Sequence, residues 1–186
     1  MEKNPLYSIG HGNRTPEAFL ELLKQFNIQF LLDVRSAPYS KFNPHFNQTE
    51  LDFFLKKNGI KYVFMGDSLG GRPDKAKHKI CYFENGTVDY EMIKKQDFFK
   101  KGLEKLKAAY NANACLGIMC SESNPCECHR SKLIGRELQE INIPLMHIDQ
   151  KGKLKNQETV ILELNEGKSD INLFGERENN TSRKKY

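Results

Sequence analysis

The sequence predicts an α/β protein in which a single, mostly parallel sheet carries helices on both faces. Short apolar runs, each typical of a buried strand, alternate with segments in which apolar residues recur at helical spacing. Polar and charged side chains follow directly after several of these runs, and the carboxyl ends of parallel strands share one edge of a sheet. The chain has 186 residues, the length of one domain. We expect that domain over residues 1–165 and a polar, frayed tail over residues 166–186.

The first strand is expected at Leu6–Ile9, and it ends in a Gly-His-Gly turn that carries His11. A helix follows, because Thr15 is a good N-cap and Pro16 fits the first helical position. Phenylalanine and leucine at helical spacing give this helix a buried face. His11 is therefore expected in a flexible turn just beyond a strand.

The run Ile28–Val34 is nearly continuous in apolar residues, which is typical of a parallel strand covered on both faces. Asp33 and Arg35 flank its last apolar residue, so a carboxylate and a guanidinium are expected at the carboxyl end of the strand. Residues 36–46 contain two prolines and predict a loop. Aromatic and basic residues interleave in this loop, a pattern that can stack unpaired bases but more often fixes a loop to the core.

Asn47 and Glu50 have the spacing of a capping box and predict a helix that Gly59 ends. A strand is expected over Ile60–Met65, and a flexible loop over residues 66–73 leaves its carboxyl end. The elements expected after this loop are an irregular segment at 74–95 with a turn at Asn85-Gly86, a helix at 98–110, a strand at 114–119, a helix at 131–141, a strand at 143–148 and a helix at 157–164.

The stretch Gly117–Arg130 carries most of the candidate chemistry. A buried strand breaks at Cys120 into a loop that also holds Cys126 and Cys128. A thiol in such a loop, close to a helix N-terminus and to His or Arg, can be stabilised as a thiolate, so Cys120 or Cys128 is the expected nucleophile. The alternative is that Cys120 is a small buried residue that ends a strand.

We expect no metal and no other cofactor. Zinc sites space paired cysteines by two to four residues, whereas one residue separates Cys126 from Cys128. A structural metal site at these cysteines is kept as an alternative. A rhodanese-like sulfur-transfer loop is a second alternative, although Arg130 is the first basic residue after Cys120 and lies too far along the chain for such a loop. Position 15 is Thr and breaks the glycine pattern of a dinucleotide-binding turn.

The net charge of +5 permits an anionic partner without requiring one. Arg35 and Arg130 are expected to hold negative charge, aided by Arg14 and Arg72. The alternative is that Asp33 pairs with Arg35, and Glu122 with Arg130, as structural ion pairs. No apolar run has the length of a membrane span, and the odd number of cysteines, 5, favours reduced thiols in the cytoplasm.

Several short motifs in fixed order resemble the large bacterial and archaeal family catalogued as domain of unknown function 488. The matching pieces are Ile9-Gly-His11, Asp33-Val-Arg35 with Pro38 and Ser40, Tyr62 followed by Leu69-Gly-Gly71, Met119-Cys-Ser-Glu122, Cys128-His-Arg130 and His147-Ile148. This chain has Ser121 where the family often has Ala, and Cys126 lies outside the family pattern. The resemblance implies an α/β domain and supplies no substrate. It favours as site residues Cys120, Glu122, Cys128, His129, Arg130, His11, Asp33 and Arg35.

The leading hypothesis is a cytoplasmic enzyme whose thiol, histidine and arginine residues act on an anionic small molecule or nucleic acid. The alternative of another class is a nucleic-acid-binding or repair-associated module with structural cysteines. The sequence does not give the oligomeric state. The expected catalytic residues are Cys120, Cys128, His11, His129, Glu122 and Asp33, and the expected substrate-binding residues are Arg35, Arg130, Arg14, Tyr62, Gly70 and Arg72.

Overall fold

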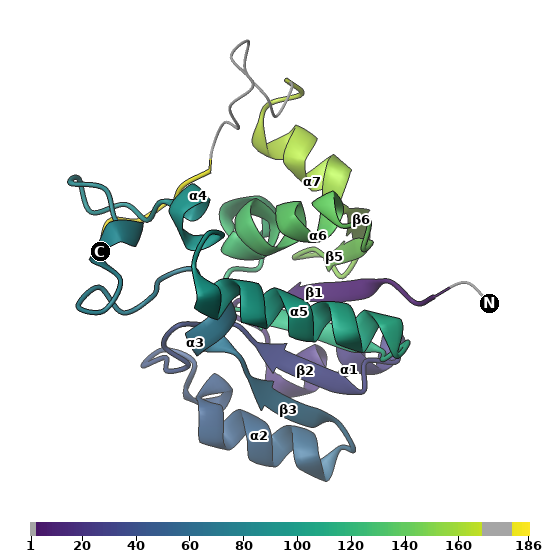
Figure 1. Ribbon diagram of the computed structural model, residues 1–186. Coiled ribbons are helices and arrows are strands. Elements are labelled where there is room, and N and C mark those ends of the chain that lie inside the picture. The colour runs from purple at the N-terminus through teal and green to yellow at the C-terminus, as the bar shows by residue number, and fades with distance from the viewer. Residues whose placement is uncertain (1–2, 169–179) are drawn as a thin grey trace.

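The computed structural model describes residues 3–168 and 180–186. It contains a 6-stranded sheet with the strand order β3-β2-β4-β1-β5-β6 (Figure 1). Strands β1 to β5 are parallel, and β6 pairs antiparallel with β5 at one edge. This arrangement confirms the predicted α/β fold class. The strands are β1 (Leu6–Gly10), β2 (Phe30–Asp33), β3 (Lys61–Phe64), β4 (Leu116–Cys120), β5 (Leu145–Ile148) and β6 (Leu154–Asn156).

Helices cover both faces of the sheet, and Figure 1 shows α5 in front of it and α1 behind it. The helices are α1 (Pro16–Gln25), α2 (Gln48–Lys57), α3 (Gly66–Leu69), α4 (Tyr90–Ile93), α5 (Asp97–Asn111), α6 (Arg136–Glu140) and α7 (Gln157–Leu164). Three short 3-10 helices lie at Pro44–Phe46, Lys79–Cys81 and Pro125–Glu127, and a π-helix at Arg130–Gly135 leads into α6.

Alternation along the central strands divides the core into two clusters. In β2, Leu31 packs with residues of α1 and α2, whereas Leu32 packs on the other face with residues of α3 and α5. In β4, Ile118 and Met119 divide in the same way, because successive side chains of a strand point to opposite faces. Each such fully buried side chain contributes roughly 1.5–3 kcal/mol, so both helical layers are anchored to the same strands.

Of the two side-chain caps predicted from the sequence, at Thr15 and Asn47, the structure confirms the first and not the second. The Thr15 hydroxyl accepts a hydrogen bond from the Ala18 N–H at 3.2 Å, as predicted. The predicted capping box at Asn47 is wrong: Asn47 occupies the cap position of α2, but its side-chain oxygen accepts from the Ser40 N–H at 2.7 Å. A short amide side chain often bonds nearby loop backbone in this way, and here it ties the 36–46 loop to the helix.

Three further predictions need correction. The expected loop at 66–73 begins with the single helical turn of α3, which packs against α5. The expected helix at 131–141 begins as the π-helix at Arg130–Gly135, a wider turn that frequently marks functional sites. The edge strand β6 was not predicted, because three residues are too few to show a clear alternation.

Residues 180–186 lie beside the irregular segment 74–95, where Figure 1 shows the yellow C-terminal chain next to teal ribbon. Thr181 forms a β-bridge with Asp89, and the Ser182 hydroxyl accepts from the Val88 N–H at 2.9 Å. The expectation of a frayed tail therefore does not describe residues 180–186, and residues 169–179 lie outside the described part of the chain. Within that described part, none of the helices combines the length and the apolar character that a membrane crossing requires.

Candidate active site

The carboxyl ends of β1, β2 and β4 lie side by side. The sheet register places Gly10 opposite Cys120 and Asp33 opposite Met119. The 121–123 loop packs directly on Gly10, where an added Cβ would lie 1.8 Å from the Glu122 carbonyl oxygen. A cavity of about 360 Å³ opens at this edge, and we call it the site cavity. Among the residues predicted from the sequence, those that line it are Arg35, Arg72, Cys120, Glu122, Cys128 and His129.

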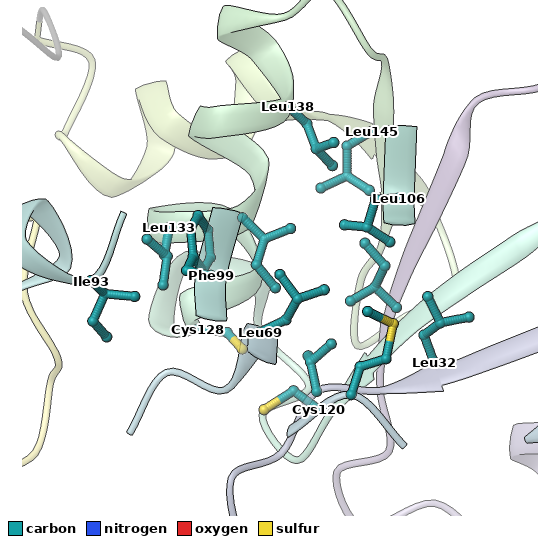
Figure 2. Close-up of a cluster of buried hydrophobic side chains, with 14 of the residues drawn as sticks. Leu32, Leu69, Ile93, Phe99, Leu106, Cys120, Cys128, Leu133, Leu138 and Leu145 are labelled. Carbon is teal, nitrogen blue, oxygen red and sulfur yellow. The ribbon is translucent and has the colours of Figure 1, made fainter. Parts of the chain in front are cut away.

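Two thiols lie at one end of a buried apolar cluster, on the side away from Leu138 and Leu145 (Figure 2). Cys120 is the last residue of β4 and not part of the following loop, and Cys128 follows a 3-10 helix. Their exposed fractions are 5% and 1%. The two sulfur atoms and the Nδ1 atom of His129 all lie within 4.8 Å of one another. The geometry thus forms a dithiol and not one isolated cysteine.

The shortest contact of each thiol is with a different group. The Cys120 Sγ atom lies 3.0 Å from the Oε2 atom of Glu122, to which it donates a hydrogen bond. The Cys128 Sγ atom lies 3.2 Å from Nε and 3.5 Å from the backbone N of Arg130, both of which donate to it. A thiolate is therefore favoured at Cys128, because both Arg130 donors are aimed at its sulfur.

Arg130 is fully buried, and the other two nitrogen atoms of its guanidinium also form hydrogen bonds. Nη1 donates to the Ser8 hydroxyl at 2.9 Å, and Nη2 donates to the Glu122 carbonyl oxygen at 2.5 Å. The expected Glu122–Arg130 pair is thus a contact with the Glu122 backbone. Arg130 does not line the site cavity, so its contact with Cys128 takes the place of the expected clamp with Arg35.

The electrostatic environment separates the two thiol pKa values. A hydrogen bond to Cys128, burial and the negative charges of Cys128 and Glu122 raise the pKa of Cys120 well above its ordinary value. Burial opposes the Cys128 thiolate, but the hydrogen bond from Cys120 and the charges of Arg130 and His129 lower the pKa of Cys128 well below its ordinary value. The pair therefore favours one thiol and one thiolate.

His129 faces both sulfur atoms. Its Nδ1 atom lies 3.8 Å from the Cys120 sulfur and 3.7 Å from the Cys128 sulfur, while its Nε2 atom donates to the Val34 carbonyl oxygen at 3.1 Å. Burial lowers the pKa of His129, but the Cys128 and Glu122 charges outweigh burial and raise it. His129 is therefore placed to give a proton to a group that leaves from sulfur.

Gly71 makes room for the His129 ring, since a Cβ there would lie 2.5 Å from His129 Cγ. Gly70 was the glycine predicted for the site. A Cβ on Gly70 would lie 2.2 Å from the Gly66 carbonyl oxygen, so Gly70 packs against the start of α3.

A second network supports the cavity wall. Asp33 and Arg35 form a buried ion pair, with Arg35 Nη2 at 2.5 Å from Asp33 Oδ2, and the Tyr62 hydroxyl donates to the same oxygen at 2.7 Å. Burial and the Asp33 carboxylate raise the pKa of Tyr62. His11 Nε2 lies 3.5 Å from Arg35 Nη1. Burial lowers the pKa of His11 to about 4, and the Gly12 carbonyl only partly opposes this shift, so His11 is neutral beside the Arg35 cation.

Arg14 is bound to the backbone of neighbouring strand ends. Its guanidinium donates to the carbonyl oxygens of Gly10 and Asp149. Arg14 is not among the residues that line the site cavity.

The site cavity also has walls that the sequence analysis missed. Tyr39, Tyr90, Tyr186 and the segment 182–184 line it. The basic residues 183–185 support the nucleic-acid-binding alternative at the level of sequence, but the assignment of a frayed tail did not place them at this site. The contact between the Arg72 guanidinium and the Tyr186 ring, 4.7 Å from the ring centroid, shows how the tail closes this side.

The positive charges around the cavity are not equally available. Arg35 is paired with Asp33, and Arg183 is paired with Glu127. Arg72 and Lys184 have no ion pair with any residue of the described ranges 3–168 and 180–186. These two cations are therefore available to an anionic ligand.

The same donor atoms suit a soft divalent cation. Two sulfur atoms and one imidazole nitrogen lie within 4.8 Å of one another, and Glu122 Oε2 is 3.0 Å and 3.6 Å from the two sulfur atoms. The His129 Nε2 contact with a carbonyl leaves Nδ1 available, as in many metal sites. The structure thus gives the metal alternative a donor set in which Cys128 is accompanied by Cys120 and His129 and not by Cys126.

A family model described as "Domain of unknown function DUF488" matches residues 15–136. No curated protein matches the chain, and no solved structure matches it.

Proposed function

The chain belongs to the family described as domain of unknown function DUF488, and because that description names no reaction, we propose from the site geometry that this protein is a cytoplasmic enzyme acting on an anionic substrate through the Cys128 thiolate. The observation that carries this proposal is the pair of Arg130 donors, Nε at 3.2 Å and backbone N at 3.5 Å, on the Cys128 sulfur. Donors in these positions stabilise the nucleophilic form of a cysteine.

The other residues have roles that follow from their positions. His129 Nδ1, 3.7 Å from the Cys128 sulfur, protonates the leaving group. Arg72 and Lys184 line the cavity without a carboxylate partner in the described ranges and bind the negative charge of the substrate. His11, Asp33 and Tyr62 act indirectly, because they hold Arg35 in the wall.

Alkylation of the reduced protein tests the proposal without a known substrate. Cys128 should react with iodoacetamide at pH 7 at least tenfold faster than Cys126, measured by quenching under anaerobic conditions and peptide mass spectrometry. Cys126 is a suitable internal reference, because its sulfur contacts Val160 and Glu163 and has no arginine donor among residues 3–168 and 180–186. Equal rates at the two cysteines would contradict a thiolate mechanism.

Exposed aromatic side chains favour a second candidate function, binding of single-stranded nucleic acid. Tyr39 is 72% exposed and Phe42 is 91% exposed, and Lys41 lies between them. Bases stack on such rings while the cation contacts phosphate. Strong binding of oligo(dT) at low salt that is lost in Tyr39→Ala with Phe42→Ala would support this function. Binding that is negligible at low salt would exclude it.

A further inference from the structure

We propose that Cys120 is a resolving thiol and that the site carries out thiol–disulfide exchange with small disulfides that bear carboxylates. This inference rests on the proposed Cys128 nucleophile and names the class of its substrate. Its basis is the position of a second thiol at the same cavity, within 4.8 Å of the first and 3.0 Å from the Glu122 carboxylate that accepts its hydrogen bond.

The two sulfur atoms are close enough to join without a change of fold. A disulfide bond is about 2.05 Å long, so the sulfur atoms must approach by less than about 3 Å. Cys120 ends a strand, whereas Cys128 lies in the loop between a 3-10 helix and the π-helix. A small movement of that loop and side-chain rotation at both cysteines bring the sulfur atoms together.

The contacts assign a different role to each thiol. Arg130 donates to Cys128 through two N–H groups, which makes Cys128 the thiolate that attacks first. Cys120 instead donates to Glu122 Oε2 at 3.0 Å, so it stays protonated until the carboxylate accepts its proton.

The reaction balances in two steps. In the first step the Cys128 thiolate attacks one sulfur of R–S–S–R, so that a Cys128–S–S–R bond forms and the substrate S–S bond breaks. The leaving R–S⁻ takes a proton from His129 and is released as R–SH. Cys120 then gives its proton to Glu122 and attacks the Cys128 sulfur, which forms the Cys120–Cys128 disulfide and releases a second R–S⁻. The substrate disulfide is reduced by two electrons, and the two cysteines are oxidised by two electrons.

The charges around the cavity favour an anionic R group. Arg72 and Lys184 line the cavity and have no ion pair within the described ranges 3–168 and 180–186. Three tyrosines, Tyr39, Tyr90 and Tyr186, also line the cavity and add aromatic side chains to its wall. This combination fits a short peptide or amino acid disulfide whose carboxylates reach the cations while its sulfur atoms reach Cys128.

Oxidised glutathione is the probe for this inference. The reduced full-length protein is mixed with it anaerobically, quenched with acid and analysed by intact mass and peptide mapping. The wild type should release two thiols per protein and form the Cys120–Cys128 disulfide. Cys120→Ser should release one thiol and keep one glutathionyl group on Cys128. Cys128→Ser should not react at the site, and Cys126→Ser should behave as the wild type. Thermal unfolding of each variant, with Cys120→Ala as a second form, checks that the fold is kept.

The outcomes separate this inference from the proposed function. If the wild type stops at a mixed disulfide on Cys128, resolution by Cys120 is wrong while the nucleophile stands. If Cys128 fails to react with both oxidised glutathione and iodoacetamide, the nucleophile and the exchange reaction are both wrong. If protein purified without chelator holds one equivalent of transition metal that protects both cysteines until it is removed, the donor set is a metal site and the exchange reaction is overturned.

Discussion

The Nε atom of Arg130 lies 3.2 Å from the sulfur of Cys128, and both side chains are buried. A guanidinium in this position serves as a fixed positive charge that is weakly screened, because the side chain of Arg130 is fully buried. The same guanidinium donates to the Ser8 hydroxyl, so its orientation depends on the first strand as well as on its own loop. The reactivity of one thiol is therefore determined by two segments that are far apart in the sequence.

Arg130→Gln should raise the pKa of Cys128, because it removes the positive charge beside the thiolate. An opposite charge at this distance changes a pKa by roughly 1–3 pH units. The pH dependence of Cys128 alkylation measures the change, with Cys126 alkylation in the same sample as the reference. An unchanged midpoint would show that Arg130 does not set the ionisation of Cys128. The variant must still unfold cooperatively, since a fully buried side chain has been altered.

Asp33→Asn should destabilise the fold by roughly 3–5 kcal/mol, because it leaves the Arg35 guanidinium buried without its counter-ion. Tyr62→Phe should cost about 1–2 kcal/mol, since Asp33 keeps its other donors. Urea unfolding at pH 7 measures both free energies. Glu104→Gln is the surface control, because Glu104 and Lys107 are exposed and such pairs contribute roughly 0–1 kcal/mol. An Asp33→Asn cost no larger than that of the control would contradict a structural ion pair.

Strand positions and their shared edge were predictable from the sequence, because burial of a strand leaves a local apolar pattern such as that of Ile28–Val34. The parallel sheet then places His11, Asp33 and Cys120 at adjacent strand ends, independently of the orientation of their side chains. The direction of a long side chain was not predictable. Arg130 turns toward a sulfur and Arg14 toward two carbonyl oxygens, and both orientations depend on contacts between distant segments.

The predicted site was incomplete because some of its residues are positioned by contacts between distant segments, which a sequence pattern does not show. Gly70 and Gly71 are equivalent in a sequence pattern, and only the packed structure shows that Gly71 faces the His129 ring. The 182–184 segment looked like a solvated tail because its residues are polar. Its attachment depends on backbone pairing with residues near Val88, and that pairing leaves no periodic signal in either segment.

Gly71→Ala should slow Cys128 alkylation severalfold and also destabilise the fold, because the buried His129 ring must shift. The added Cβ would lie 2.5 Å from His129 Cγ, so the ring must move away from the sulfur atoms. Gly59→Ala is the matched control: its positive φ of +75 makes alanine strained, but no atom of the described residues lies within 4 Å of the new Cβ. That control should lose about 1 kcal/mol of stability and keep the wild-type alkylation rate. Equal alkylation rates in both variants would remove His129 from the proposed chemistry.

Arg72→Gln and Lys184→Gln should each lower the preference of Cys128 for an anionic reagent. The measured quantity is the ratio of the iodoacetate rate to the iodoacetamide rate, because the two reagents differ mainly in charge. We expect each substitution to reduce this ratio severalfold at low salt and less at 0.5 M salt, where screening weakens both cations. Lys107→Gln, on the exposed face of α5, is the control with the same charge change. A ratio that responds equally to all three substitutions would indicate net charge and not a binding site.

His147→Gln should make the fold less sensitive to mild acid. The ring is fully buried, with Nδ1 at 2.9 Å from the Ser8 hydroxyl and Nε2 at 2.7 Å from the Gln157 oxygen. Burial, with the Arg130 charge in support, lowers the pKa of His147 from 6.5 to about 4, and the Gln157 contact only partly opposes this. In the unfolded chain, His147 is therefore protonated below about pH 6.5, whereas in the folded chain it stays neutral down to about pH 4. Protonation favours the unfolded state between these two values, so stability is lost as the pH falls from 6.5 to 4.

The size of this effect follows from the two pKa values. Between pH 7 and pH 5, His147 should cost the wild type about 2 kcal/mol of unfolding free energy, and His11, whose pKa is also lowered to about 4, should cost a similar amount. Urea unfolding at both pH values should show that His147→Gln loses about 2 kcal/mol less than the wild type over this interval, whatever its stability at pH 7. The same pH dependence in variant and wild type would mean that His147 already carries a second proton in the folded protein, and its Nδ1–H would then donate to the Ser8 hydroxyl instead of accepting from it.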